Sequence, residues 1–306
     1  MMKSSSASWQ MWPDKKVNRK TKANLEGYSF ILPGTLLLLI FSFIPITVTI
    51  YLSFQKYNGL NPPQWVGFAN YIKAFKDYAV TESFKNTLLF TVVTVPVQVA
   101  VSLSIAALLA ARYKNKFGEF VRGALFIPVL CSATLVGSVF FYVFAATEDS
   151  IANTIVGLFG ISKINWLGST KTALWVIMFV SIWKGIGYFI VIFYAGIMDI
   201  PITLYEVSQI DGASRMDQFI YITIPNLKNV LYMVITISII WSLQFFDITY
   251  AMTKGGPGYA TSSLVYVVYS TGFNYFNMGY ASAVAVLLAI LIAIFTAIQR
   301  SVMKED

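Results

Sequence analysis

Six apolar stretches alternate with polar segments along the 306-residue chain. They cover roughly residues 28–54, 86–111, 123–146, 172–197, 229–250 and 280–299. A helix needs about 20 mostly apolar residues to cross a bilayer, and every stretch reaches that length. Pro128 lies inside the third stretch, and membrane helices tolerate proline because neighbouring helices satisfy the freed carbonyl. The pattern predicts an all-α membrane protein with six transmembrane helices.

The polar segment between the fourth and fifth stretches, residues 204–225, is rich in charge for a chain of which only 12% is charged. Unpaired charges are costly inside hydrocarbon, so this segment must lie outside the membrane. Its residues predict two short helices. Thr203 can cap the first helix with Glu206 three residues later, and Asp211-Gly212 is a turn dipeptide.

The second short helix has its own start and stop signals. Ser214 can cap it, and Asp217 stands where a carboxylate favours a helix N-terminus. Pro225 is expected to end it. The alternative interpretation of this segment is an ordinary capped helix–turn–helix between two membrane spans.

Charge then orients the chain. With the N-terminus in the cytoplasm, fourteen Lys and Arg residues fall in inside segments and seven in outside segments. Positive residues gather on the cytoplasmic side of membrane proteins, so both termini and residues 204–225 are predicted to be cytoplasmic. The chain has no histidine and a single cysteine, Cys131, which excludes a disulfide framework and the commonest metal ligand.

The residues of the polar segment resemble a known family. Glu206, Asp211-Gly212-Ala213 and the Ile-Thr-Ile before Pro225 resemble the cytoplasmic coupling loop of permease subunits of ATP-binding-cassette importers. Where the family pattern has Glu-Ala-Ala, this chain has Glu-Val-Ser. In that family the loop docks on an ATPase subunit. The resemblance therefore implies contacts with an ATPase from Glu206, Asp211, Gly212, Ala213 and Arg215.

Three further segments resemble the sugar-importing branch of this family, the maltose-type permeases. They are residues 65–71, with Trp-Val-Gly-Phe-Ala-Asn-Tyr, the Gly-Gly-Pro loop at 255–257, and Gly-Tyr-Ala-Ser-Ala at 279–283. Read without the family, residues 65–71 are also a plain aromatic anchor, and spacing predicts a short amphipathic helix through Phe75. The Gly-Gly-Pro loop by itself marks only a turn.

The resemblance implies a type I importer permease fold in the bacterial cytoplasmic membrane. It implies a six-helix permease domain over residues 28–300, with coupling helices over 199–226 between the fourth and fifth spans. Short cytoplasmic tails, 1–27 and 301–306, complete the expected organisation.

Two ionisable residues lie inside predicted spans, Lys184 in the fourth and Asp247 near the outer end of the fifth. Such groups usually face a partner or a polar cavity, so they predict either a structural Lys–Asp pair or a translocation pathway. Aromatic and hydroxyl residues at helical spacing surround them and can either pack in the core or contact a sugar. The resulting candidate pathway comprises Ser181, Lys184, Gly185, Tyr188, Ser238, Trp241, Ser242, Phe245 and Asp247.

The chain lacks the G-x-x-x-x-G-K-[ST] loop that binds ATP phosphates, so no enzymatic role and no cofactor of its own is expected. The resemblance implies ATP and Mg on two ATP-binding subunits, a second permease subunit and an extracytoplasmic sugar-binding protein, within membrane lipid and without nucleic acid. Three alternatives remain open. They are import of polyols or glycerol-phosphate compounds, an ion-coupled secondary transporter, which needs carboxylate cation sites, and a membrane-embedded enzyme.

Overall fold

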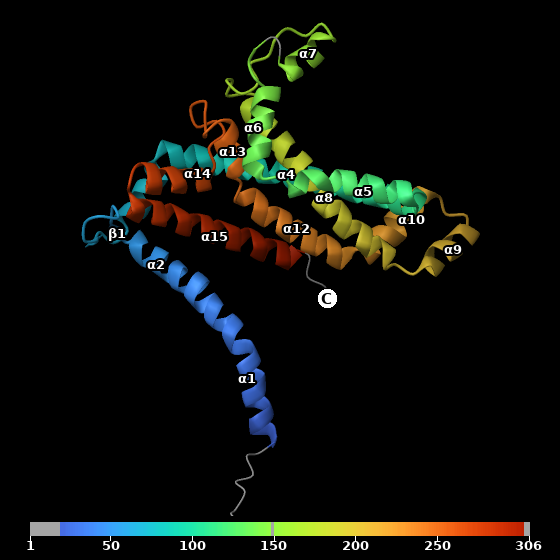
Figure 1. Ribbon diagram of the computed structural model, residues 1–306, viewed down its shortest axis with the longest axis horizontal. Coiled ribbons are helices and arrows are strands. Elements are labelled where there is room, and N and C mark those ends of the chain that lie inside the picture. The colour runs from blue at the N-terminus through green and yellow to red at the C-terminus, as the bar shows by residue number, and fades with distance from the viewer. Residues whose placement is uncertain (1–18, 148–149, 303–306) are drawn as a thin grey trace, which may run out of the picture. The chain divides into compact units, whose positions relative to one another are not determined.

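The computed structural model describes residues 19–147 and 150–302, and the chain divides into two compact units, residues 1–48 and 49–306. The described residues of the first unit, 19–48, are helical (Figure 1). Its segments are α1 (Arg19–Leu38), the π-helical turn η1 (Leu39–Phe43) and the start of α2 (Ile44–Ser53). The predicted tails at 1–27 and 301–306 fall largely outside the described residues.

The second unit begins with a small folded segment at one end, here termed the β1 end. Strands β1 (Gln55–Lys56) and β2 (Gln64–Trp65) pair antiparallel, and α3 (Ala69–Lys76) follows. The Asn70 amide donates to the backbone oxygens of Ser53 and Gln55, each at 2.9 Å, and ties α3 to the preceding chain. The short helix predicted after residue 68 is thereby confirmed.

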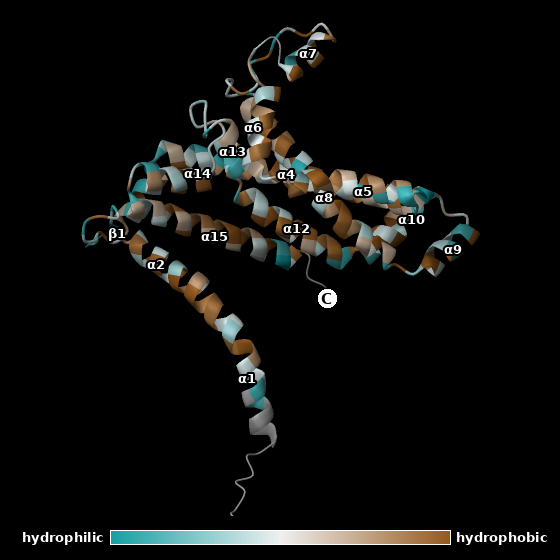
Figure 2. Ribbon diagram, viewed as in Figure 1, coloured by the Kyte–Doolittle hydropathy of each residue, from teal (hydrophilic) through white to brown (hydrophobic). Residues whose placement is uncertain are grey.

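Four long helices run lengthwise through the second unit (Figure 1). They are α4 (Tyr78–Arg112), α8 (Ala173–Met198), α12 (Lys228–Leu243) and α15 (Met278–Val302). Figure 2 shows mostly hydrophobic residues along them and hydrophilic residues nearer their ends. In the described part of the chain, five helices are long and apolar enough to cross a membrane, or six if one bent pair counts as a span. Helices of sufficient length and apolarity thus stand at five of the predicted spans, although α4 begins eight residues before the predicted start at residue 86.

The third predicted span, 123–146, is wrong as a single straight helix. It is a pair, α5 (Lys116–Leu130) and α6 (Ala133–Val143), bent by 96°. Pro128 lacks an amide hydrogen, and Cys131 and Ser132 adopt extended backbone angles between the two helices. Beyond the bend, α6 packs against α13 (Asp247–Met252), whereas α5 packs against α8. A short helix, α7 (Ile151–Gly157), follows α6.

The opposite end of the second unit, termed the α9 end, carries the helices predicted from residues 204–225 (Figure 1). They are α9 (Ile202–Ile210), α10 (Arg215–Gln218), the π-helical turn η2 (Phe219–Thr223) and α11 (Ile224–Asn226). The predicted cap at Thr203 is wrong, because α9 begins at Ile202 after Pro201 and has no side-chain cap. Pro225 sits within α11, so the helical run extends one residue further than predicted.

The core of the second unit consists of separate apolar clusters. One, termed the inner cluster, lies toward the α9 end and joins Leu103 and Leu109 of α4 to Phe189 and Phe193 of α8. A second, termed the middle cluster, joins α4 to α8 and α13 nearer the β1 end. A third packs α14 (Leu264–Tyr269) against α3 and α15, and the π-helical turn η3 (Ser270–Asn274) follows α14. The stretch of α8 between the first two clusters, residues 181–185, belongs to neither, whereas Ile186 and Tyr188 pack against the inner cluster.

Candidate functional site

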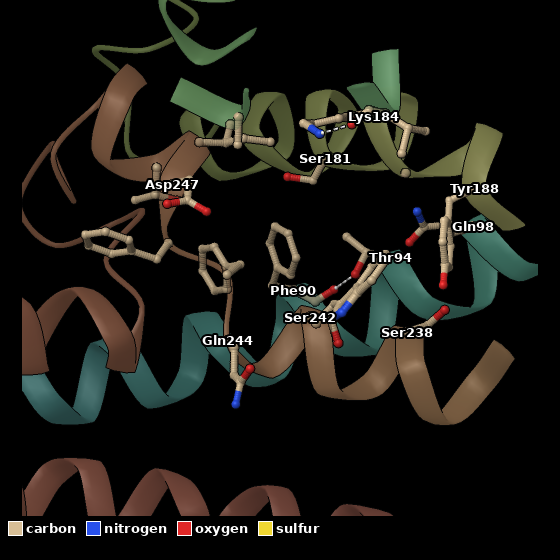
Figure 3. A pocket seen from close by; sticks show the side chains of 18 residues that line it. Phe90, Thr94, Gln98, Ser181, Lys184, Tyr188, Ser238, Ser242, Gln244 and Asp247 are labelled. Carbon is tan, nitrogen blue, oxygen red and sulfur yellow. Dashed lines mark hydrogen bonds between the residues drawn. The ribbon is translucent and has the colours of Figure 1, made fainter. Parts of the chain in front are cut away.

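A cavity of about 420 Å³ fills the gap between the inner and middle clusters. It lies among α4, α8, α12 and α13, which contribute most of its lining (Figure 3). This volume is in the range of small-molecule sites, about 300–1,000 Å³. The structure brings all nine predicted pathway residues to it: Ser181, Lys184, Gly185, Tyr188, Ser238, Trp241, Ser242, Phe245 and Asp247.

The two charged residues lie on different walls of the cavity. The Lys184 ammonium donates to the backbone oxygen of Val129 in α5 at 3.3 Å, as Figure 3 shows. No ion pair joins Lys184 to Asp247 in the described structure. Among the described residues, an ion pair forms between Lys85 and Glu82. The predicted structural Lys–Asp pair is therefore not formed. An ammonium carries three N–H donors, so Lys184 keeps capacity for a ligand.

The aromatic residues divide into packed and open ones. Phe245 stacks on Phe90 of α4 with ring centroids 4.0 Å apart and planes 3° apart. The rings of Trp241 and Tyr188 are in contact, with centroids 5.1 Å apart, and Trp241 keeps 49% of its surface exposed. Core packing thus describes Phe245, whereas the Trp241 ring remains available to a bound molecule.

Two hydroxyl groups at the cavity lack any hydrogen-bond partner among the described residues. They belong to Ser238 in α12 and Thr249 in α13, which are 2% and 0% exposed. By contrast, Ser242 donates to the backbone oxygen of Ile239 at 3.0 Å. An unsatisfied buried polar group costs about 1–3 kcal/mol, so a hydrogen bond from a ligand or water to either hydroxyl would stabilise that group.

A third wall, from α4, was missed by sequence reasoning. It contributes Phe90, Thr94 and Gln98. The Gln98 amide occupies the space that a Cβ on Gly185 would fill, so the glycine creates the notch that admits it. The Gln98 amide in the middle of an apolar span could have indicated a functional position. The packing of α4 beside α8, however, is not visible in the sequence.

The residues predicted to contact an ATPase lie at the α9 end, in the segment between the cavity-lining helices α8 and α12. Glu206, Asp211, Gly212 and Arg215 are exposed, and Ala213 is half-buried. Gly212 has φ +80, a left-handed conformation that strains other residues, and it forms the turn predicted after α9. Val207, Ile210 and Met216 expose apolar side chains beside these residues.

The predicted cap of the second short helix is confirmed. The Ser214 hydroxyl accepts from the Asp217 amide at 3.2 Å, and the Asp217 carboxylate accepts from the Ser214 amide at 2.9 Å and hydroxyl at 2.6 Å. These bonds favour the ionised form and lower the pKa of Asp217 below its ordinary value.

Polar contacts join the two short helices into one unit. The Gln218 amide donates to the Ser208 hydroxyl at 2.8 Å and to the Tyr205 backbone oxygen at 3.2 Å. The Tyr205 hydroxyl lies 3.0 Å from the Thr223 hydroxyl. Tyr205 and Phe219 also pack against the inner cluster, which contains residues of α4 and α8.

Comparison with known proteins places this architecture in a family. Residues 102–304 match the family model described as binding-protein-dependent transport system inner membrane component. This match covers about two thirds of the chain and includes the α9 end and three of the four helices around the cavity.

Individual relatives match along nearly their whole length. The arabinooligosaccharides transport system permease protein AraP of Bacillus subtilis is 33% identical over 297 residues, which cover 96% of this chain and 92% of that protein. The trehalose/maltose transport system permease protein MalF of Thermococcus litoralis is 31% identical over 280 residues, 90% and 92% of the two chains. In a crystal structure of a bacterial alginate transporter complexed with an alginate pentasaccharide-bound periplasmic protein, one chain matches with TM-score 0.82, 19% identity and coverage of 95% and 100%.

Proposed function

This chain belongs to the family of inner-membrane components of binding-protein-dependent transport systems, and we propose that it is a permease subunit of an ATP-driven carbohydrate importer. The observation that carries the proposal is the cavity between the inner and middle clusters. It combines an open tryptophan ring, two unpartnered hydroxyls and two charged groups within the bundle. Two relatives that match at least nine tenths of this chain support the proposal, because they are named as permeases for arabinooligosaccharides and for trehalose and maltose.

The chemistry of the cavity suits a neutral, hydroxyl-rich solute. The open face of Trp241 can cover the apolar face of a sugar ring. Lys184 and Gln98 can donate to sugar hydroxyls, Asp247 can accept from them, and Ser238 can do either. Because one positive and one negative group face the cavity, no net charge on the solute is required.

The proposed mechanism is alternating access driven from the α9 end. ATP is bound and hydrolysed by partner subunits, whose closure pushes α9 and α10. The polar contacts of Gln218 and Tyr205 make these helices move together, and the inner cluster passes the movement to α4 and α8. The bundle then turns its cavity toward the extracytoplasmic binding protein, from which it receives the sugar.

The proposal includes a full assembly. A second permease subunit completes the pathway, two ATP-binding subunits dock at the cytoplasmic α9 end, and an extracytoplasmic binding protein delivers the solute. The periplasmic protein in the alginate transporter complex supports the last of these partners. Both termini are cytoplasmic in this scheme, as the distribution of Lys and Arg predicts.

An ion-coupled secondary transporter fits the cavity less well. Cation sites in such proteins use carboxylates and backbone carbonyls shielded within the membrane. Among the described residues that line the cavity, Asp247 supplies the single carboxylate, and its side chain is exposed.

Affinity purification of the tagged chain from its native membrane tests the proposal. We expect co-purification of an ATP-binding subunit, a second permease and, in the presence of solute, a binding protein that binds an oligosaccharide. A binding protein that takes only a polyol or a glycerol-phosphate compound would overturn the carbohydrate assignment. Absence of any ATPase from an intact, detergent-stable preparation would overturn the ATP-driven assignment.

A further inference from the structure

A second cavity, of about 460 Å³, lies at the β1 end of the second unit. It shares no lining residue with the first cavity, which lies between the inner and middle clusters and is termed the pathway cavity from here on. It is bounded by the junction of α3 with α4, the loop between α13 and α14, η3 and the start of α15. Six of its lining side chains are aromatic rings or amides, and the lining also includes the charged residues Lys73, Asp77 and Lys254. The six are Tyr259, Tyr266, Tyr275, Tyr280, Asn274 and Asn277. This cavity includes the Gly-Gly-Pro loop, to which the proposed transport mechanism gives no part.

The loop holds an unusual backbone conformation at this cavity. Lys254 and Tyr259 have φ of 50 and 68, left-handed values that are uncommon outside glycine. Gly255 has φ +80, and a Cβ there would lie 2.7 Å from the Tyr266 ring. The glycine therefore permits both the turn and the close approach of the ring, which explains Gly255 better than a turn alone does.

Hydrogen bonds hold the Gly-Gly-Pro loop in this conformation. The Thr261 hydroxyl donates to the backbone oxygen of Gly256 at 2.7 Å and lies 2.7 Å from the Thr253 hydroxyl. The Asn86 amide in α4 donates to the backbone oxygens of Tyr259 and Ser262 at 2.7 and 3.1 Å. The left-handed residues are thus held by several bonds, as expected where strain serves a site.

Some lining groups are already engaged with one another. The Tyr280 hydroxyl donates to the Asp77 carboxylate at 2.8 Å, and the Lys73 ammonium lies 4.3 Å above the Tyr280 ring. The other Asp77 oxygen accepts from the Ala79 amide at 2.9 Å. These contacts build one wall. The ring of Tyr275, exposed by 76%, remains open to a ligand, and that of Tyr259, exposed by 44%, makes a T-shaped contact with Tyr78 at a centroid distance of 6.1 Å.

We propose that this second cavity is a saccharide-binding subsite, distinct from the pathway cavity, that holds an oligosaccharide at the mouth of the transporter. Tyrosine rings offer flat apolar faces, while amides and hydroxyls pair with sugar hydroxyls. A concave site of this volume suits a small ligand better than the broad contact of a docked protein. The inference rests on the proposed function, because only a carbohydrate importer would use such a site.

The two cavities are linked through a single short helix. Asp247 and Thr249 of α13 line the pathway cavity, and Lys254, two residues beyond α13, lines the second. The Lys254 amide donates to the Thr249 backbone oxygen at 2.9 Å. The six residues of α13 span about 9 Å, so a short rigid element joins residues that line the two cavities.

The test uses the assembled transporter in nanodiscs without its binding protein, with maltotriose and arabinotriose as probes in saturation-transfer difference NMR titrations. Trp241→Ala is introduced first to weaken the pathway cavity. In that background we expect Tyr275→Ala to weaken trisaccharide binding by about tenfold or more, and Asn274→Ala to weaken it severalfold. Phe273→Ala, an exposed aromatic of η3 that does not line the cavity, should change binding by less than about twofold.

Several outcomes would overturn the inference. Equal binding by the Tyr275, Asn274 and Phe273 variants would do so, as would weakened docking of the binding protein with unchanged trisaccharide binding. Absence of binding to the Trp241→Ala complex, when the wild-type complex imports the same trisaccharide, also excludes the subsite but leaves the proposed function intact. A wild-type complex that imports no saccharide at all removes the proposed function itself. ATPase rate and gel-filtration elution show whether each variant is assembled.

Discussion

Lys184 and Asp247 face one cavity from separate helices, yet the Lys184 ammonium bonds to the Val129 backbone oxygen at 3.3 Å and not to the Asp247 carboxylate. A charge inside a membrane protein usually pairs with another charge or serves transport. Because the two groups do not neutralise each other here, both remain available to a solute. This arrangement favours a binding role over a purely structural one.

Replacing Lys184 with Met tests that role. Met keeps the length of the side chain but removes its donors, so we expect the KM of uptake to rise about tenfold to a hundredfold, as for loss of a charged hydrogen bond. The thermal unfolding midpoint should stay close to that of the wild type. Asp247→Asn is the matched variant, since it retains shape and removes charge. Unchanged uptake kinetics in both variants would show that the charges are structural.

Substitution of two glycines of α8 that lie two residues apart should produce different defects, one in solute binding and one in stability. A Cβ at Gly185 meets the mobile end of Gln98, whereas a Cβ at Gly187 meets the Leu125 backbone oxygen of α5, which cannot move aside. We expect Gly185→Ala to unfold normally but bind the solute more weakly, because Gln98 is displaced. Gly187→Ala should cost about 1–3 kcal/mol of stability through overpacking. Thermal unfolding and equilibrium solute binding of both purified variants separate the two effects, and identical behaviour would contradict the predicted difference.

The cap of α10 predicts a dependence on pH. The pKa of Asp217 is lowered because its carboxylate accepts hydrogen bonds from Ser214. Its contribution is therefore present above the ordinary carboxyl pKa and is lost as the pH falls through the lowered value. We expect hydrogen-exchange protection of the α10 amides, corrected for intrinsic rates, to begin to fall below about pH 5 and to keep falling below the ordinary carboxyl pKa of about 3.9. Asp217→Asn should show no such transition, and an equal transition in that variant would assign the change to another group.

Gly212 tests the coupling surface. Valine at this position is strained by φ +80, although nothing lies within 4 Å of its Cβ, so the defect should be confined to the α9–α10 turn. We expect Gly212→Val to insert normally and to lose ATP-driven uptake. Gly160→Val is the matched control, since Gly160 has φ +71, equally open surroundings and a position after α7. Loss of uptake in both variants would point to general damage and not to coupling.

The side of the membrane on which α9 lies is a further prediction. Cys131 is the single cysteine in the sequence, so a Cys131→Ser background makes Asp211→Cys a unique label site. A membrane-impermeant maleimide should leave residue 211 unlabelled in intact cells and label it in inside-out vesicles. Labelling in intact cells would place the segment outside and contradict any contact with a cytoplasmic ATPase.

The sequence predicts the cavity faces of α8 and α12 well, because a regular helix places residues three and four positions apart on one side. Ser181, Lys184 and Tyr188 therefore meet Ser238 and Trp241 as spacing suggests. The α4 wall could not be predicted this way, since the partner of a buried helix is set by packing between elements distant in sequence.

Helix caps and bends were predicted with mixed success, because some depend on neighbouring residues alone and others on packing. The Ser214 cap was predicted correctly because both partners lie within one turn. The predicted Thr203 cap failed because α9 begins one residue earlier, at Ile202. The 96° bend between α5 and α6 follows from packing against two different helices, and Pro128 alone does not reveal its size.

The most direct measurement is oligosaccharide uptake into proteoliposomes that contain this chain with its co-purified partners. We predict accumulation that requires both ATP on the side of residue 211 and the binding protein on the opposite side, and that no sodium or proton gradient can replace ATP. Uptake by the purified chain alone, or uptake driven by an ion gradient without nucleotide, would contradict the proposed function.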